Sequence, residues 1–203
     1  MPPNAVPPAS VGKLLRRFRR NRNASAAVEF ALVAPVFFAL LFAIIETGIM
    51  FFASQVLETI TQDSARVLLT GQAQNGLVPI CGVSGQATAC TQATFNSYVC
   101  SQIPALFNCN SANGIFVDVE NYPAGFAGIT INSQIDGGGN FINNMQYSPG
   151  SACAIVVVRL FYQWPLFVTG LGYNIANLTG SKRLLTATAV FRNEPYSNGT
   201  CTT

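Results

Sequence analysis

Residues 30–45 read FALVAPVFFALLFAII and decide the fold, because this run contains no charged side chain. After Glu46, Thr47 and Gly48 the apolar run resumes and ends at Ala53. At about 1.5 Å per residue, the roughly 24 residues from 30 to 53 extend about 36 Å, which exceeds a hydrocarbon core of about 30 Å. A cleaved secretory signal has a shorter apolar region, of about 7–15 residues. The run therefore predicts one membrane-spanning helix.

The helix is expected to continue past the membrane. Residues 54–71 read SQVLETITQDSARVLLTG, and apolar side chains recur there among polar ones at near-helical spacing: Val56, Ile60, Val67 and Leu68. Gly71 is a typical helix stop signal. The pattern predicts a single helix from about Ala24 to Leu69.

The basic residues are distributed unevenly along the chain. Six of the eleven precede residue 23, and they are Lys13, Arg16, Arg17, Arg19, Arg20 and Arg22. A short basic run ahead of an apolar helix is typical of a cytoplasmic flank, so we expect the N-terminus in the cytoplasm. No nucleic-acid-binding motif accompanies the run, and nucleic acid is therefore not an expected partner.

All cysteines follow the apolar helix, and they are Cys81, Cys90, Cys100, Cys109, Cys153 and Cys201. An even number on one side of a membrane segment indicates disulfides formed in an oxidising compartment. The chain has no histidine and no CxxC pair, which argues against zinc or an iron–sulfur cluster, and no cofactor is expected. Many pairings are open; the short-range pairs Cys81–Cys90 and Cys100–Cys109 are the simplest, with Cys153–Cys201 as a reasonable third.

The remaining segments predict an α+β fold, with a long N-terminal transmembrane helix followed by a small disulfide-bonded domain that contains an antiparallel β-sheet. One weakly helical stretch is expected at about Gln92–Ile103. Runs with strand character follow at Ile115–Val119, Gly128–Ile131, Cys153–Leu166 and Arg183–Phe191. We expect a basic cytoplasmic leader over 1–23, the helix with its extracytoplasmic extension over 24–70, and a periplasmic domain over 71–203. Residues Met1–Gly12 are rich in proline and alanine and are expected to be disordered.

Residue types that carry catalysis are scarce. Without histidine the common catalytic triads are missing, and disulfide-bonded cysteines supply no nucleophile. Asp118 and Glu120 lie on one face of an expected strand, where a solvated surface is the favoured interpretation over a cation or hydrolase site. The sequence therefore predicts a protein that is not an enzyme.

Two acidic residues accompany the apolar run. Glu29 stands at its cytoplasmic edge, either as a first-turn carboxylate favoured by the helix dipole or as the recognition residue of a prepilin-type signal. Glu46 lies deeper, toward the outer leaflet. It marks either a helix end in the headgroup region or a contact with another anchor helix.

Residues Ala26–Val36, AAVEFALVAPV, resemble the opening of TadE-like proteins, the minor pseudopilins of the tight-adherence (Flp) pilus machinery. The resemblance continues at Glu46-Thr47-Gly48, at Asp63–Arg66 and at Gly71. Near the C-terminus, Arg192–Pro195 resembles a closing motif of the group. The segment from about 72 to 182 carries no motif of this family.

The resemblance implies a structural or assembly component of a tight-adherence pilus, anchored in the bacterial inner membrane with its domain in the periplasm. Its implied partners are the membrane, other pilin or pseudopilin and secretion-system subunits, and a prepilin peptidase. Such a peptidase would cut between Ala24 and Ser25 and leave Glu29 at the fifth mature position, although the family usually has glycine where Ala24 stands. The helix can also serve as an uncleaved anchor. The alternative function is a membrane-anchored periplasmic binding module unrelated to pili.

Overall fold

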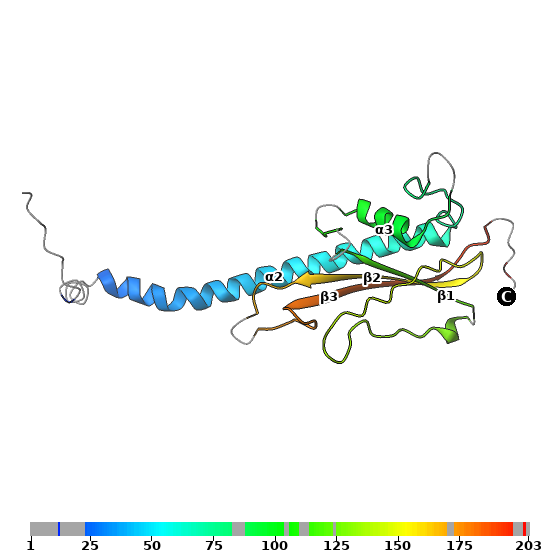
Figure 1. Ribbon diagram of the computed structural model, residues 1–203. Helices are drawn as coiled ribbons and strands as arrows, with labels where there is room; N and C mark the ends of the chain where they lie inside the picture. Colours follow the sequence, from blue (N-terminus) through cyan, green and yellow to red (C-terminus); the bar gives the residue numbers. More distant parts are fainter. Residues whose placement is uncertain are drawn as a thin grey trace, which may run out of the picture. The chain divides into compact units, whose positions relative to one another are not determined.

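The structure is a computed structural model that describes residues 12, 23–82, 88–103, 106–109, 114–123, 125–169, 173–196 and 201. In chain order the elements are helix α2 (Asn23–Leu69), helix α3 (Gln92–Ser101), strand β1 (Phe116–Tyr122), the 3₁₀ helix η1 (Phe126–Gly128), strand β2 (Ile155–Pro165) and strand β3 (Lys182–Arg192) (Figure 1). The chain forms two compact units, Met1–Ile45 and Glu46–Thr203. The predicted α+β class is confirmed, whereas the leader and the predicted disorder before Gly12 lie outside the described residues.

Helix α2 ends where the sequence predicts. The backbone N–H of Gly71 donates to the carbonyl of Leu68, and the N–H of Gln72 donates to that of Val67. Gly71 has a φ of 75°, a left-handed conformation that glycine adopts without steric cost and that commonly closes helices. The stop signal at Gly71 is thus confirmed.

Helix α3 confirms the weakly helical stretch that was expected at Gln92–Ile103. Its N-terminus is a reciprocal capping box, in which the Thr91 side chain accepts from the N–H of Thr94 and the Thr94 side chain accepts from the N–H of Thr91. This arrangement satisfies two backbone donors that a helix start otherwise leaves unpaired. The helix buries Phe95 and Val99, which are one turn apart on the same face.

The three strands form one antiparallel sheet in the order β1-β2-β3. The prediction of a strand at Gly128–Ile131 is wrong, because Gly128 is the last residue of η1 and residues 129–131 pair with no strand. The outer edge of β1 is occupied by a different segment. Val119 exchanges backbone hydrogen bonds with Gln146 and Ser148, so this part of the edge pairs with residues 146–148 and not with residues 129–131.

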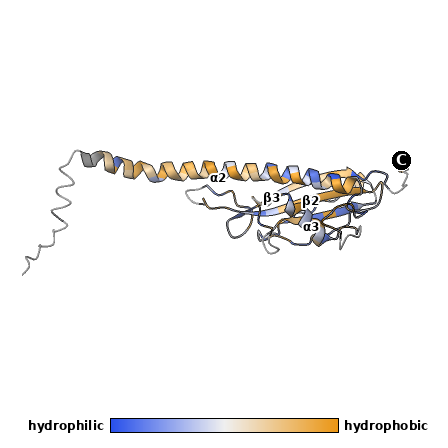
Figure 2. Cartoon of the chain, turned by 90° about the horizontal axis from the view of Figure 1, so that it is seen from above, coloured by the Kyte–Doolittle hydropathy of each residue, from blue (hydrophilic) through white to orange (hydrophobic). Residues whose placement is uncertain are grey.

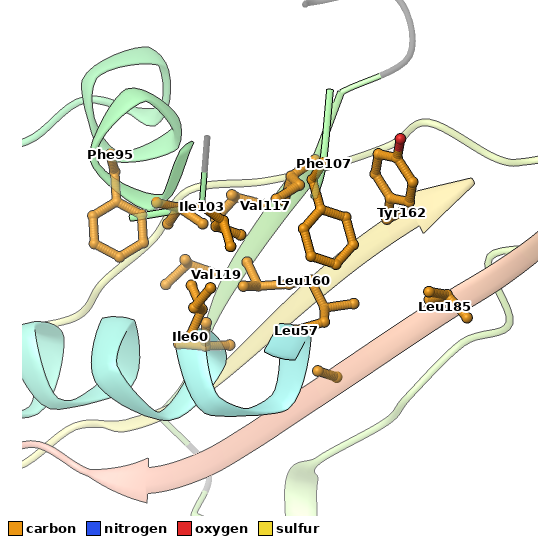
Figure 3. Packing of buried hydrophobic residues seen from close by; sticks show 14 of the residues in the cluster. Leu57, Ile60, Phe95, Ile103, Phe107, Val117, Val119, Leu160, Tyr162 and Leu185 are labelled. Atoms are coloured by element: carbon orange, nitrogen blue, oxygen red, sulfur yellow. The ribbon is translucent and has the colours of Figure 1, made fainter. Parts of the chain in front are cut away.

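The hydrophobic core lies between one face of the sheet and the two helices (Figure 3). Cross-strand pairing aligns Val117 with Leu160 and Val119 with Val158, so alternate residues of β1 and β2 point to this face. Figure 3 shows side chains from both helices, all three strands and the loop after α3 converging there: Leu57, Ile60, Phe95, Ile103, Phe107, Val117, Val119, Leu160, Tyr162 and Leu185. This packing builds the second half of α2 into the domain.

The opposite face of the sheet carries a buried ion cluster. Asp118 lies directly across from Arg159, and Arg159 Nη2 is 2.6 Å from Asp118 Oδ2 and 2.7 Å from Glu120 Oε1. The solvated face expected for Asp118 and Glu120 is therefore wrong for Asp118, which is fully buried. The segment 130–147 covers this face, because Gln146 N–H donates to Asp118 and Arg159 donates to the carbonyl of Asn132.

Three disulfides join Cys81 to Cys90, Cys100 to Cys109, and Cys153 to Cys201. These are the simplest pairs that the sequence suggests. Cys153 directly precedes β2 and Cys201 follows β3, so the third disulfide ties the C-terminal segment to the start of the central strand. Cross-links of this kind stabilise a small domain mainly by restricting its unfolded chain.

Candidate functional site

The first half of α2 presents apolar side chains to its surroundings on every side. Between Ala26 and Ile45 the large apolar residues are exposed, with 69% of Phe30 and 70% of Ile44 accessible. Figure 2 shows this segment as almost continuously hydrophobic. The helix is long and apolar enough to cross a membrane. An apolar surface that surrounds a helix suits lipid, where all backbone polar groups are satisfied within the helix.

The second half of α2 is amphipathic instead. Its buried residues recur every three or four positions and face the sheet: Met50, Ala53, Leu57, Ile60, Ser64 and Leu68. Past Phe52 the exposed positions are polar, as at Gln55, Thr59 and Gln62. This pattern is typical of a helix with one face on a protein core and one in water.

Glu46 lies where these two halves meet, and its carboxylate is bound by the chain itself. The N–H of Phe167 donates to Glu46 Oε1, and the N–H of Val168 donates to Oε2 at 3.0 Å. Glu46 is only 8% exposed, so these donors replace the water that an ionised carboxylate otherwise requires. We call this pair of hydrogen bonds the Glu46 contact.

The Glu46 contact holds the connection between β2 and β3. Leu166 N–H donates to the carbonyl of Ser181 at the base of this connection, and Thr47 and Tyr173 share a hydrogen bond between their hydroxyl groups. Leu166 is buried, whereas Phe167 is 85% exposed. The connection is therefore fixed to α2 at the consecutive residues Glu46 and Thr47, whereas the side chain of Phe167 is exposed.

Glu29 is exposed, and it lies beyond the first turn of α2, which contains no acidic residue. The helix begins at Asn23, six positions before Glu29, so the interpretation of Glu29 as a first-turn carboxylate is wrong. The dipole effect falls off within the first turn and does not account for the residue. Ala24 and Ser25 are helical, and the structure describes their backbone only.

The C-terminal motif Arg192–Pro195 meets the end of α2. Glu194 N–H donates to the carbonyl of Leu69 at 2.8 Å. The Asn193 side chain is buried and donates to the carbonyls of Pro149 and Ser151, both at 2.9 Å. At Gly71 a Cβ atom would overlap the ring of Tyr196. Two segments that are far apart in the sequence, at Gly71 and at 192–196, thus form one cap on the helix.

The buried ion cluster ties the sheet to the segment that covers it. Burial raises the pKa of Asp118, and the hydrogen bonds from Gln146 and Arg159 oppose that rise. The hydrogen bonds of the Arg159–Asp118 pair are made within the sheet or to the covering segment. Within the described part of the chain, no group of three or more His, Cys, Asp or Glu residues could hold a metal ion.

Sequence reasoning identified Glu46 but missed its partner. The signal that was available is the composition of the β2–β3 connection, because residues 166–181 contain no charged side chain. An uncharged segment rich in apolar residues is unusual for a loop in water. Only the fold shows that this connection returns to Glu46.

These features define a class of protein in which one apolar N-terminal helix continues into a small disulfide-bonded α+β domain. The comparisons with known proteins agree with this class and with the resemblance in sequence: the model of the family TadE-like protein matches residues 24–66. The matched segment lies within α2 and includes both Glu29 and Glu46. No curated protein and no solved structure matches the chain.

Proposed function

We propose that this protein is a structural or assembly component of a tight-adherence (Flp-type) pilus, a TadE-like minor pseudopilin anchored in the bacterial inner membrane. The observation that carries the proposal is the match of the TadE-like family model to residues 24–66, the segment in which the apolar helix passes into the folded domain. Proteins of this family are components of pilus assembly and are not enzymes. The protein acts through helix packing and domain contacts.

The proposed orientation has the N-terminus in the cytoplasm and the domain in the periplasm. The six basic residues that precede residue 23 support it, because positive charge is retained on the cytoplasmic side of a membrane helix. The three disulfides also support it, since such bonds persist in the periplasm and are rare in the cytosol.

We further propose that a prepilin peptidase cuts between Ala24 and Ser25. The cut would make Ser25 the first residue of the helix and place Glu29 about one turn from a new, positively charged α-amine. A carboxylate at that distance can pair with the amine of a neighbouring subunit. This would give Glu29 a role in the assembly of subunits.

The processing step is tested by the intact mass of the full chain purified from its native membrane, with and without the prepilin peptidase gene. We expect the wild-type protein and an Ala24→Gly variant to begin at Ser25. An Ala24→Asp variant should keep its leader, as should the wild type in the deletion strain. The same Ala→Asp change at Ala27 is the matched control, and it should leave the cleavage position unchanged. An N-terminus at residue 1 or 2 in the wild type would contradict the cut.

The assembly role is tested by cross-linking in the native membrane followed by purification of this chain. We expect pilin, pseudopilin or secretion-system subunits in the cross-linked material. A Leu40→Arg variant, which places a charge in the apolar run, should lose both membrane insertion and these partners. If the wild-type protein neither changes size nor associates with pilus subunits, the pilus assignment fails, and the membrane-anchored binding module becomes the better account.

A further inference from the structure

The exposed ring of Phe167 lies close to the point where the apolar helix ends. Glu46 directly follows the uncharged run that closes at Ile45, and its carboxylate is bound by the N–H groups of Phe167 and Val168. If a hydrocarbon core of about 30 Å begins near Phe30, it takes about 20 helical residues and ends near Ile49. The backbone at Phe167 is therefore held at the depth of the membrane boundary.

From this placement we propose that residues 166–169 and 173–175, the Phe167 loop, bind the lipid surface of the same bilayer that holds the helix. Phe167 would enter the boundary between headgroups and acyl chains on the domain's side of the membrane. The proposal rests on the membrane anchoring included in the proposed function. It adds a second, non-helical membrane contact to that anchor.

The chemistry of the loop fits this partner. Phe167 is 85% exposed, and leaving so large an apolar side chain in water is costly. No charged residue occurs between 166 and 181, whereas Lys182 and Arg183 follow directly at the start of β3. Apolar and aromatic residues flanked by basic ones are typical of segments that lie in the membrane interface.

Two exposed phenylalanines of α2, in the same compact unit as Phe167, support the placement of Phe167 at the membrane boundary. Phe51 and Phe52 stand five and six positions after Glu46 on α2, about one and a half turns, and both are largely exposed. Phenylalanine is among the apolar residues that interfacial segments bury at the boundary between headgroups and acyl chains, and the exposed surface of α2 becomes polar only after these two residues. Phe51, Phe52 and Phe167 would together form an aromatic belt at one end of the domain.

The loop is also held in place before it meets lipid. The Glu46 contact and the hydrogen bond between Thr47 and Tyr173 fasten it to two consecutive residues of α2. A fixed loop loses less conformational entropy on binding than a free one. A smaller entropy cost therefore offsets the free energy gained by burying Phe167 in lipid. The Glu46 carboxylate thus positions the ring for the membrane.

The test is a depth measurement on the full chain reconstituted in nanodiscs of phosphatidylcholine and phosphatidylglycerol. Every native cysteine is in a disulfide, so one added cysteine can be labelled selectively with a nitroxide. The variant is Phe167→Cys, which replaces an exposed side chain and leaves the fold intact. Collision rates with oxygen, which concentrates in lipid, and with a water-soluble nickel chelate report the label's depth.

Phe126→Cys is the matched control, because Phe126 is another exposed phenylalanine of the same domain, at 60% exposure. It lies in η1, beyond the end of the sheet where Tyr122 pairs with Ile155, whereas Phe167 follows the opposite end, where Pro165 pairs with Lys182. The two sites are separated by about ten strand residues, or roughly 33 Å. Phe38→Cys, within the apolar run, reports on the anchor itself.

We expect the ratio of oxygen to nickel collisions at residue 167 to exceed that at residue 126 severalfold and to stay below that at residue 38, because residue 38 lies near the middle of the proposed span and residue 167 at its boundary. Equal ratios at 167 and 126, with residue 38 in lipid, would overturn the lipid contact and leave the anchor intact. Protection of residue 167 from both reagents would also overturn it, since that result means burial against a second copy of the chain. A label at residue 38 that meets the nickel reagent freely would instead refute the membrane anchor.

Discussion

The two halves of α2 belong to one helix but are built for different surroundings. Before Glu46 the large apolar side chains are exposed around the helix, and after Phe52 they are confined to a stripe that faces the sheet. Each half contains many apolar residues, but only the second mixes them with polar and charged residues at helical spacing. The period of the apolar residues separates them, and it changes where the Glu46 contact joins the helix to the domain.

The first prediction tests this difference with one substitution made on each side of Glu46. Leu57 is completely buried in the core, so Leu57→Ala should lower the free energy of unfolding of the domain by about 2–5 kcal/mol. Leu40 is largely exposed, and Leu40→Ala should leave that free energy almost unchanged. Denaturant unfolding of the full chain in nanodiscs, followed by the fluorescence of Trp164, measures both. Equal losses would show that the two halves do not differ in this way.

The second prediction concerns the residue that divides the halves. Glu46→Ala removes both acceptors of the Phe167 and Val168 N–H groups, and a hydrogen bond to a charged group contributes about 1.5–3 kcal/mol. Hydrogen exchange at these two amides should accelerate by about tenfold or more, at about 1.4 kcal/mol per factor of ten. Glu58→Ala, twelve positions further along the same helix, is the control and should leave both amides unchanged. Unchanged exchange in Glu46→Ala would contradict the contact.

The third prediction uses pH, which acts on the domain but not on the apolar run, because residues 30–45 contain no ionisable side chain. Burial, together with the hydrogen bond that Tyr122 donates to Glu120, raises the pKa of Tyr122 to about 12 from its ordinary value of 10.0. The folded state therefore keeps this proton while the unfolded chain loses it. The stabilising contribution is complete below pH 10 and is lost as pH rises from 10 to about 12.

Tyr122→Phe should flatten the fall in domain stability over this range, and tyrosinate absorbance should lose a component with a midpoint near pH 12. Part of the fall should remain, because burial also raises the pKa of Tyr147. A tyrosinate titration that is identical in the variant and the wild type would show that Tyr122 is not shifted. The helical signal of the apolar run should persist throughout.

Local patterns were sufficient to predict much of the fold. The run at 30–45, the spacing of apolar residues after Ala53 and the glycine at 71 predict α2 almost to the residue, because a helix is determined by neighbours in sequence. The density of β-branched and aromatic residues likewise predicts β2, and the alternation of apolar with small or polar residues predicts β3. The prediction of a strand at 128–131 was wrong, because the edge of β1 at Val119 pairs with residues 146–148 instead.

The features that sequence reasoning missed depend on partners far away in the chain. Asp118 was expected on a solvated face, and it is buried because Arg159, on a strand 41 positions later, neutralises it. Glu46 was expected to lie among headgroups or against another helix, and it is bound by a loop that begins about 120 residues later. A carboxylate in an apolar stretch is expected to have a partner, but the amino-acid sequence does not identify which distant group provides it.

The second half of α2 is attached to the rest of the domain at both of its ends, and this determines how the domain would resist a pulling force. The helix is joined to the β2–β3 connection at Glu46, and Leu69 is joined to Glu194 at the other end. Between them the stripe from Met50 to Leu68 packs on the core. A load applied along the helix axis acts on all these contacts in parallel, as in shear, whereas a load across the axis would open them one after another. The domain is thus arranged to withstand tension delivered through its own anchor.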